Sequence, residues 1–112
     1  MKYEEDRMQM AVARYLDLLG VLWFHPANER RTSIQAGVRL KKKGVKSGVP
    51  DCLILESNNT YKGLAIELKT TKGKLSENQK KWLSDLQDNG FCCYVCRSFD
   101  EAKEKIDEYF NT

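Results

Sequence analysis

The stretch that decides the fold runs from Asp51 to Lys69 and reads DCLILESNNTYKGLAIELK. Two apolar runs, DCLIL and KGLAIELK, are separated by the polar segment SNNT, a composition typical of a β-hairpin turn. Both runs are apolar at nearly every position, which favours strands that are buried on both faces. The sequence therefore predicts a hairpin whose two strands both lie inside a sheet.

Helical and extended patterns alternate on both sides of this hairpin. Ser76 and Ser98 each begin a capping-box pattern, with Gln79 and Glu101 three residues later. Apolar spacing predicts helices over 3–19, 33–43, 76–89 and 98–110, and further strands over 21–24 and 91–96. This order predicts an α/β fold in which a mixed central sheet is flanked by helices, in a single domain over residues 1–112.

The composition is that of a soluble globular protein. The chain has 112 residues, of which 41% are hydrophobic and 31% charged, enough for one domain with a modest core. The sequence contains no apolar run of signal-peptide or membrane-helix length. We therefore expect an intracellular protein that is not secreted and has no membrane partner.

The four cysteines are predicted to be reduced core residues. Three of them, Cys92, Cys93 and Cys96, lie in the strand pattern FCCYVC, and the fourth, Cys52, lies in DCLIL. On a strand, Cys93 and Cys96 point to opposite faces, so they do not chelate one metal ion. A structural zinc site is the less favoured alternative.

Positive charge is concentrated in the middle of the chain. The net charge is only +3, but seven basic residues and no acid lie between residues 30 and 50, while many acids lie near the two ends. These residues are Arg30, Arg31, Arg39, Lys41, Lys42, Lys43 and Lys46, and a later basic loop adds Lys72 and Lys74. Such a distribution is typical of a surface that binds a polyanion. The alternative is a solvated basic surface without a partner.

The hairpin also brings acidic residues to one end of the sheet. Asp51 opens the first strand, and Glu67 lies near the end of the second, so antiparallel pairing places them side by side. Two adjacent carboxylates repel each other unless a cation lies between them, and Mg²⁺ binds through one or two carboxylates plus water. Lys69 shares a face with Glu67, so it would assist hydrolysis of a phosphodiester. The alternative is an exposed Glu67–Lys69 ion pair, which the apolar neighbours argue against.

These residues resemble the PD-(D/E)XK nuclease motif, with Asp51 in GVPD and Glu67-Leu68-Lys69 in AIELK. The flanking segments WFHPANE, KKKGVKSGVPD and LSENQ are similar to one branch, the virus-type replication-repair nuclease (VRR-NUC) domain. The resemblance covers nearly the whole chain. It implies a restriction-endonuclease-like αβββαβ core, which agrees with the order of elements read from the patterns.

The resemblance also implies roles for individual residues. Asp51, Glu67 and the backbone carbonyl of Leu68 would hold the metal ion, and Lys69 would act on the attacking water or the scissile phosphate. Glu5 matches the acidic residue of the family's first helix, with Glu4 as the competing candidate. Gln79 matches a helix glutamine near the active site. A capping role alone is an equally good interpretation of Gln79, and both roles are compatible.

One segment departs from the family pattern. Many relatives have the order His-x-Pro-Asn-Glu, whereas this chain has HPANE, from His25 to Glu29, with the proline displaced by one position. We therefore leave His25, Asn28 and Glu29 outside the predicted site.

The function implied by the resemblance is a Mg²⁺-dependent, structure-selective DNA endonuclease in which Mn²⁺ substitutes for Mg²⁺. Stand-alone domains of this kind resemble Holliday-junction resolvases, which act as homodimers on branched DNA in bacterial or phage-infected cells. The alternatives are a nuclease that cuts flaps, nicks or duplex ends, and a DNA-binding module with a vestigial nuclease site.

Overall fold

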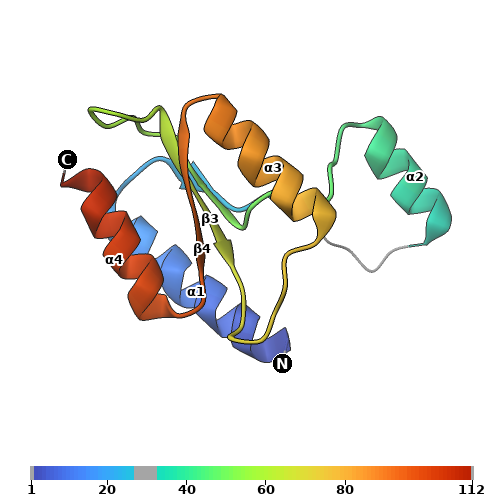
Figure 1. Ribbon diagram of the computed structural model, residues 1–112. Helices are drawn as coiled ribbons and strands as arrows, with labels where there is room; N and C mark the ends of the chain where they lie inside the picture. The colour runs from blue at the N-terminus through green and yellow to red at the C-terminus, as the bar shows by residue number, and fades with distance from the viewer. Residues whose placement is uncertain (1, 27–32, 112) are drawn as a thin grey trace.

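The computed structural model describes residues 2–26 and 33–111, and every predicted helix and strand is present (Figure 1). The elements are, in chain order, α1 (Lys2–Leu19), β1 (Trp23–Phe24), α2 (Ile34–Lys42), β2 (Cys52–Ile54), β3 (Gly63–Leu68), α3 (Glu77–Asp88), β4 (Phe91–Cys96) and α4 (Phe99–Phe110). The first two strands are shorter than predicted, because pairing covers only part of each apolar run. Arg30 and Arg31 lie outside the described residues.

The four strands form one mixed sheet in the order β1-β2-β3-β4. β1 and β2 pair antiparallel, β2 and β3 pair antiparallel, and β3 and β4 pair parallel. The predicted hairpin is therefore confirmed, and both of its strands are interior. Its turn is closed by Asn58, whose side-chain oxygen accepts hydrogen bonds from the backbone of Thr60 and Tyr61 at 2.9 and 2.7 Å.

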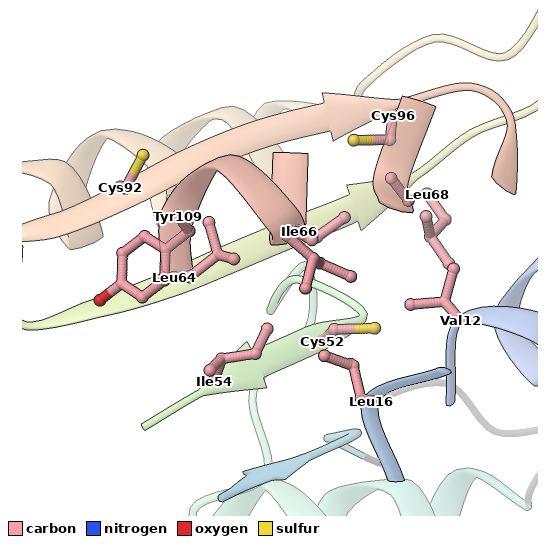
Figure 2. Packing of buried hydrophobic residues seen from close by; sticks show 12 residues of the cluster. Val12, Leu16, Cys52, Ile54, Leu64, Ile66, Leu68, Cys92, Cys96 and Tyr109 are labelled. Atoms are coloured by element: carbon pink, nitrogen blue, oxygen red, sulfur yellow. The ribbon is translucent and has the colours of Figure 1, made fainter. Parts of the chain in front are cut away.

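The hydrophobic core lies between the sheet and the pair of helices α1 and α4. Val12 and Leu16 of α1 point toward Ile54, Ile66 and neighbouring strand residues (Figure 2), and all four are fully buried. Ala102, Ile106 and Tyr109 close the cluster from α4. This arrangement confirms the predicted α/β fold with a mixed sheet flanked by helices.

The cysteines contribute to this core as free thiols. Cys52, Cys92 and Cys96 belong to the buried cluster, while Cys93 points to the other face of β4 and is only partly buried. Burial raises the pKa of Cys52 to about 12 and that of Cys96 to about 12. These thiols therefore stay protonated at neutral pH and behave as small apolar side chains.

The helix ends follow the capping patterns, with one difference. Ser76 and Gln79 form the complete predicted capping box at α3. At α4, Ser98 accepts from the Glu101 backbone N–H at 3.0 Å, but the Glu101 side chain accepts from Arg97 N–H at 2.7 Å. The predicted second capping box is therefore only half formed, because Glu101 reaches one residue further back than Ser98.

The other face of the sheet is covered only in part. α3 packs beside β4 on the side opposite α1 and α4 (Figure 1). α2 projects away from the body near the start of α3, and none of its nine residues, all of them described, is buried. Across residues 2–26 and 33–111, no helix combines the length and the apolar character that crossing a membrane requires.

Candidate active site

The pairing of β2 with β3 brings Asp51 and Glu67 together. Cys52 lies opposite Ile66, so the residues that precede and follow them are neighbours at one end of the sheet. A hydrogen bond joins the two strands at this end, because the Asp51 carboxylate accepts from the backbone N–H of Leu68 at 2.7 Å. The antiparallel register thus places the two predicted carboxylates side by side.

The alternation of side chains along β3 separates the core from the site. Ile66 and Leu68 belong to the hydrophobic cluster, and Glu67 between them points to the opposite face, where its residue is only 3% exposed. Lys69 follows the strand, and its backbone N–H donates to Cys96 O at 3.0 Å. The end of β4 therefore fixes the backbone of the predicted catalytic lysine.

The first turn of α3 supplies Gln79, which has two roles at once. Its side-chain oxygen accepts from Ser76 N–H at 2.8 Å, and its amide nitrogen donates to Glu67 Oε2 at 3.0 Å. The two interpretations of Gln79 are compatible because the amide carries an acceptor and a donor at separate atoms. One glutamine joins the cap of a helix to a buried carboxylate.

The loop before Asp51 packs against the same turn of α3. Gly48 has a φ of +86°, and a Cβ at this position would lie 2.7 Å from Asn78 atoms. Asn78 also donates to Ser47 Oγ at 2.6 Å. Glycine is therefore required here for both its backbone conformation and the close approach that brings Asp51 toward α3.

These elements enclose a pocket of about 210 Å³. Glu5, Asp51, Glu67, Lys69 and Gln79 line it together. Glu4, the competing candidate on α1, lines a separate pocket with Arg7 and Arg97. The structure thus brings Glu5 to the other predicted site residues and directs Glu4 elsewhere, because successive helix positions point about 100° apart.

The surroundings of Glu67 disfavour its charged form. Burial raises the pKa of Glu67 to about 9, the negative charge of Asp51 adds to the rise, and the Lys69 ammonium opposes it. Glu67 Oε1 is buried and has no hydrogen-bond partner among the described residues. A carboxylate in this state needs either a proton or a bound cation.

The donor set fits a hard divalent cation. Within the described ranges, no three side chains from His, Cys, Asp and Glu gather into one metal-binding group. A cation at Asp51 and Glu67 would therefore complete its shell with water or backbone oxygen, which is how Mg²⁺ binds to proteins. The role of the Leu68 carbonyl stays a prediction.

The predicted DNA-binding residues are exposed wherever the structure describes them. Those that the structure describes are Arg39, Lys41, Lys42, Lys43, Lys46, Lys72 and Lys74. None of them pairs with an acid within residues 2–26 and 33–111, whereas Lys80 and Lys81 of α3 pair with Glu77 and Asp85. The loop and α2 therefore carry positive charge that the described acids do not neutralise.

Two residues near the site were not predicted from the sequence. His25 Nδ1 lies 2.7 Å from the backbone oxygen of Asp51. Arg97 Nη1 donates to Thr70 O and to Gly73 O, both at 2.7 Å. These two hydrogen bonds hold the loop that follows Lys69 in place. The HPANE motif was a signal for His25, but Arg97 stands in no motif. Asn28 and Glu29 lie outside the described residues.

Comparisons with known proteins identify the family and agree with the fold. The family model for the VRR-NUC domain matches residues 2–100. A Fanconi-associated nuclease 1 homolog of Arabidopsis thaliana is 43% identical over 54 residues, which cover 46% of this chain and 6% of that protein. A solved VRR-NUC domain protein has a TM-score of 0.74 and 24% identity, over 96% of this chain and 88% of its own.

Proposed function

Since the chain belongs to the VRR-NUC family of nuclease domains, we propose that it is a Mg²⁺-dependent DNA endonuclease. The observation that carries this proposal is the buried Glu67, which lies beside Asp51 and Lys69 and retains a carboxylate oxygen without a described partner. A buried acid with a strongly raised pKa in a polar pocket is typical of a functional site.

Each residue of the pocket would have a separate role in phosphodiester hydrolysis. Asp51 and Glu67 would hold Mg²⁺ or Mn²⁺, which when bound polarises the phosphate and favours attack by water. Lys69 places an ammonium beside the two carboxylates, where it stabilises negative charge that develops on the phosphate. Gln79 holds Glu67 through its amide, and Glu5 lines the pocket with a further carboxylate, which would order water near the cation.

The exposed cations supply the affinity for DNA. α2, which carries Arg39, Lys41 and Lys42, projects away from the body (Figure 1), and Lys72 and Lys74 are exposed in the loop that follows Lys69. Contacts of this kind neutralise backbone phosphates, so binding weakens with salt and depends little on base sequence. The nuclease would therefore select DNA by its shape.

We further propose that the preferred substrate is a four-way junction, cut by a homodimer. The support is the resemblance to Holliday-junction resolvases, together with the one Asp51–Glu67 pair that lines this pocket in each chain. Two symmetric cuts need two such pockets, and a twofold homodimer provides them.

The direct test is a cleavage assay with matched DNA. A four-way junction, a flap, a nicked duplex and a linear duplex of the same sequences are incubated with Mg²⁺, with Mn²⁺ and with EDTA. We expect cleavage of the junction with either metal, and none with EDTA or with Asp51→Asn. Binding without cleavage of any substrate would favour the vestigial module, and preference for flaps or ends would refute the resolvase assignment.

The homodimer has its own measurement. Light scattering at micromolar concentration should give twice the mass of one 13.0 kDa chain. A monomer at that concentration would contradict paired cutting and leave the nuclease proposal to the cleavage assay.

A further inference from the structure

We propose that His25 is a positioning residue that fixes Asp51 for cation binding. The proposal deepens the proposed function, because it rests on the cation site assigned there. It starts from one contact between segments that lie 26 residues apart in the chain, namely His25 Nδ1 at 2.7 Å from the Asp51 carbonyl oxygen.

The chemistry of this contact defines the state of the ring. A carbonyl oxygen only accepts hydrogen bonds, so Nδ1 of His25 must be the N–H donor. In the neutral ring, Nε2 is then the unprotonated nitrogen. The ring is exposed, so the core does not hold it in place, and among the described residues its side chain makes this one hydrogen bond.

The register of the sheet explains why a side chain is needed here. Phe24 lies opposite Leu53, and Leu55 N–H donates to Leu22 O, so hydrogen-bonded pairs recur every second residue. Continuation of this ladder would place Pro26 opposite Asp51. Proline has no N–H, so at this position the backbone that follows β1 offers no donor to the Asp51 carbonyl. The neighbouring His25 side chain supplies it.

Asp51 is thereby held at both its backbone and its side chain. His25 binds the carbonyl from the β1 side, Leu68 N–H binds the carboxylate from β3, and the preceding Pro50 is fully buried. Partners of metal ligands that do not themselves touch the metal typically change metal affinity by about 10–100-fold when they are removed. Loss of the His25 donor should therefore weaken cation binding by a factor in this range.

The test uses the untagged chain of 112 residues, in which His25 is the only histidine. After selective ¹⁵N labelling of histidine, the imidazole nitrogens of one residue appear in the spectrum without ambiguity. We expect the neutral ring to carry its proton on Nδ1. A ring protonated on Nε2 in the neutral form would overturn the proposal, because that tautomer cannot donate to Asp51.

Metal affinity is then measured by Mn²⁺ titration calorimetry without DNA on four variants. His25→Ala and His25→Gln should bind Mn²⁺ about 10–100-fold more weakly. His25→Asn should stay within about threefold of wild type, because its amide N–H lies where Nδ1 lies, whereas that of Gln lies nearer Nε2. Leu22→Ala, at an exposed neighbouring position, should leave affinity unchanged and controls for local loosening of β1.

The outcomes separate this proposal from the nuclease assignment. Wild-type affinity in His25→Ala, or equal loss in the Asn and Gln variants, would overturn the role of His25. The expected order of affinities in a protein that cuts no DNA would support the role of His25 and refute the nuclease. A wild-type protein that binds no Mn²⁺ at millimolar concentration would refute both.

Discussion

The two faces of the sheet differ in how completely helices cover them and in the residues they carry. On one face, α1 and α4 cover Ile54, Ile66 and Leu68, which are almost completely inaccessible to solvent. On the other, α3 covers the β4 side, and Phe24 and Leu55 near β1 remain 46% and 45% exposed. The site residues Glu67 and Gln79 meet on this less completely covered face.

This difference teaches that stability and chemistry are separated by the alternation of one strand. Neighbouring residues of β3 serve opposite faces, so Ile66 contributes to packing while Glu67, one peptide bond away, costs free energy through its burial. The fold tolerates this cost because packing on the opposite face stabilises it. Variants on the core face should therefore lose stability, whereas variants on the site face should lose activity.

The largest effect is expected from Lys69→Ala. Removal of the ammonium should lower the cleavage rate by about 10²–10³-fold, since a charge that stabilises the phosphate is lost. The free energy of unfolding should change by less than about 1 kcal/mol, because Lys69 is half-buried and lies outside the hydrophobic core. Single-turnover cleavage and urea unfolding measure the two quantities, and cleavage at the wild-type rate would remove Lys69 from the site.

The opposite outcome is expected for Ile66→Ala. This change leaves a cavity between the sheet and α1, so the free energy of unfolding should fall by about 2–5 kcal/mol. Ile66→Val, which should cost about 0.5–1.5 kcal/mol, serves if the alanine variant does not fold. Cleavage per folded molecule should stay near wild type, and a large loss of cleavage in a folded Ile66→Val variant would contradict the separation of the two faces.

The pH dependence of stability tests the burial of Glu67. Its pKa in the folded, metal-free protein is about 9, above the ordinary value of 4.5, so the folded state binds the extra proton between these values. Stability from this group is therefore complete below pH 4.5 and is lost as the pH rises through 9. One proton corresponds to a loss of at most about 1.4 kcal/mol per pH unit.

Thermal unfolding in EDTA between pH 5 and pH 9 is the measurement. Glu67→Gln keeps the shape of the side chain without its charge, so its melting temperature should fall less toward alkaline pH than that of wild type. Addition of Mg²⁺ should stabilise the wild type most at high pH, because the cation competes with the proton. Parallel melting curves for wild type and variant would contradict a raised pKa.

The two roles of Gln79 can be separated at the start of α3. Ser76→Ala removes one half of the capping box and should cost about 1 kcal/mol of stability. Cleavage should stay within about threefold of wild type, because the hydrogen bond from Gln79 to Glu67 remains. Gln79→Ala removes that bond too and should also lower cleavage by about tenfold. Equal cleavage in both variants would reduce Gln79 to a capping residue.

The smallest effect on stability is expected on α2. Replacement of Lys41 and Lys42 in α2 and of Lys43 directly after it by alanine should leave the melting temperature unchanged, because all three side chains are exposed. DNA affinity should fall, and the slope of log affinity against log salt should decrease by about 0.9 for each phosphate that the variant no longer neutralises. Lys80→Ala with Lys81→Ala is the matched control, since both lysines already pair with acids of α3. An unchanged salt slope in the triple variant would exclude α2 from the DNA surface.

The order of the helices and strands was predictable because each element follows from its own local sequence pattern. The nearly continuous apolar run GLAIEL and the Ser76–Gln79 capping box act over a few residues, so they are readable without tertiary contacts. The adjacency of Asp51 and Glu67 was also predictable, since a hairpin turn fixes the register of its two strands. Family membership is likewise confirmed.

The remaining features required contacts between distant segments. Glu4 and Glu5 are equivalent by composition, and only the packing of α1 places Glu5 in the pocket with Asp51. Arg97 reaches Gly73 across 24 residues, and no local pattern indicates it. The half-formed capping box at Ser98 shows that even a correct motif leaves its partner atoms undetermined.

The sequence by itself determined the sheet, the helices and the strand end at which Asp51, Glu67 and Lys69 gather. Only the tertiary structure decided how the site is completed, through Gln79 on Glu67, His25 on Asp51 and Glu5 across the pocket. The physical reason is the distance along the chain between the residues that interact. Backbone pairing and helix periodicity are set by neighbouring residues, whereas a side-chain hydrogen bond depends on where packing places two separate segments, within a few tenths of an ångström.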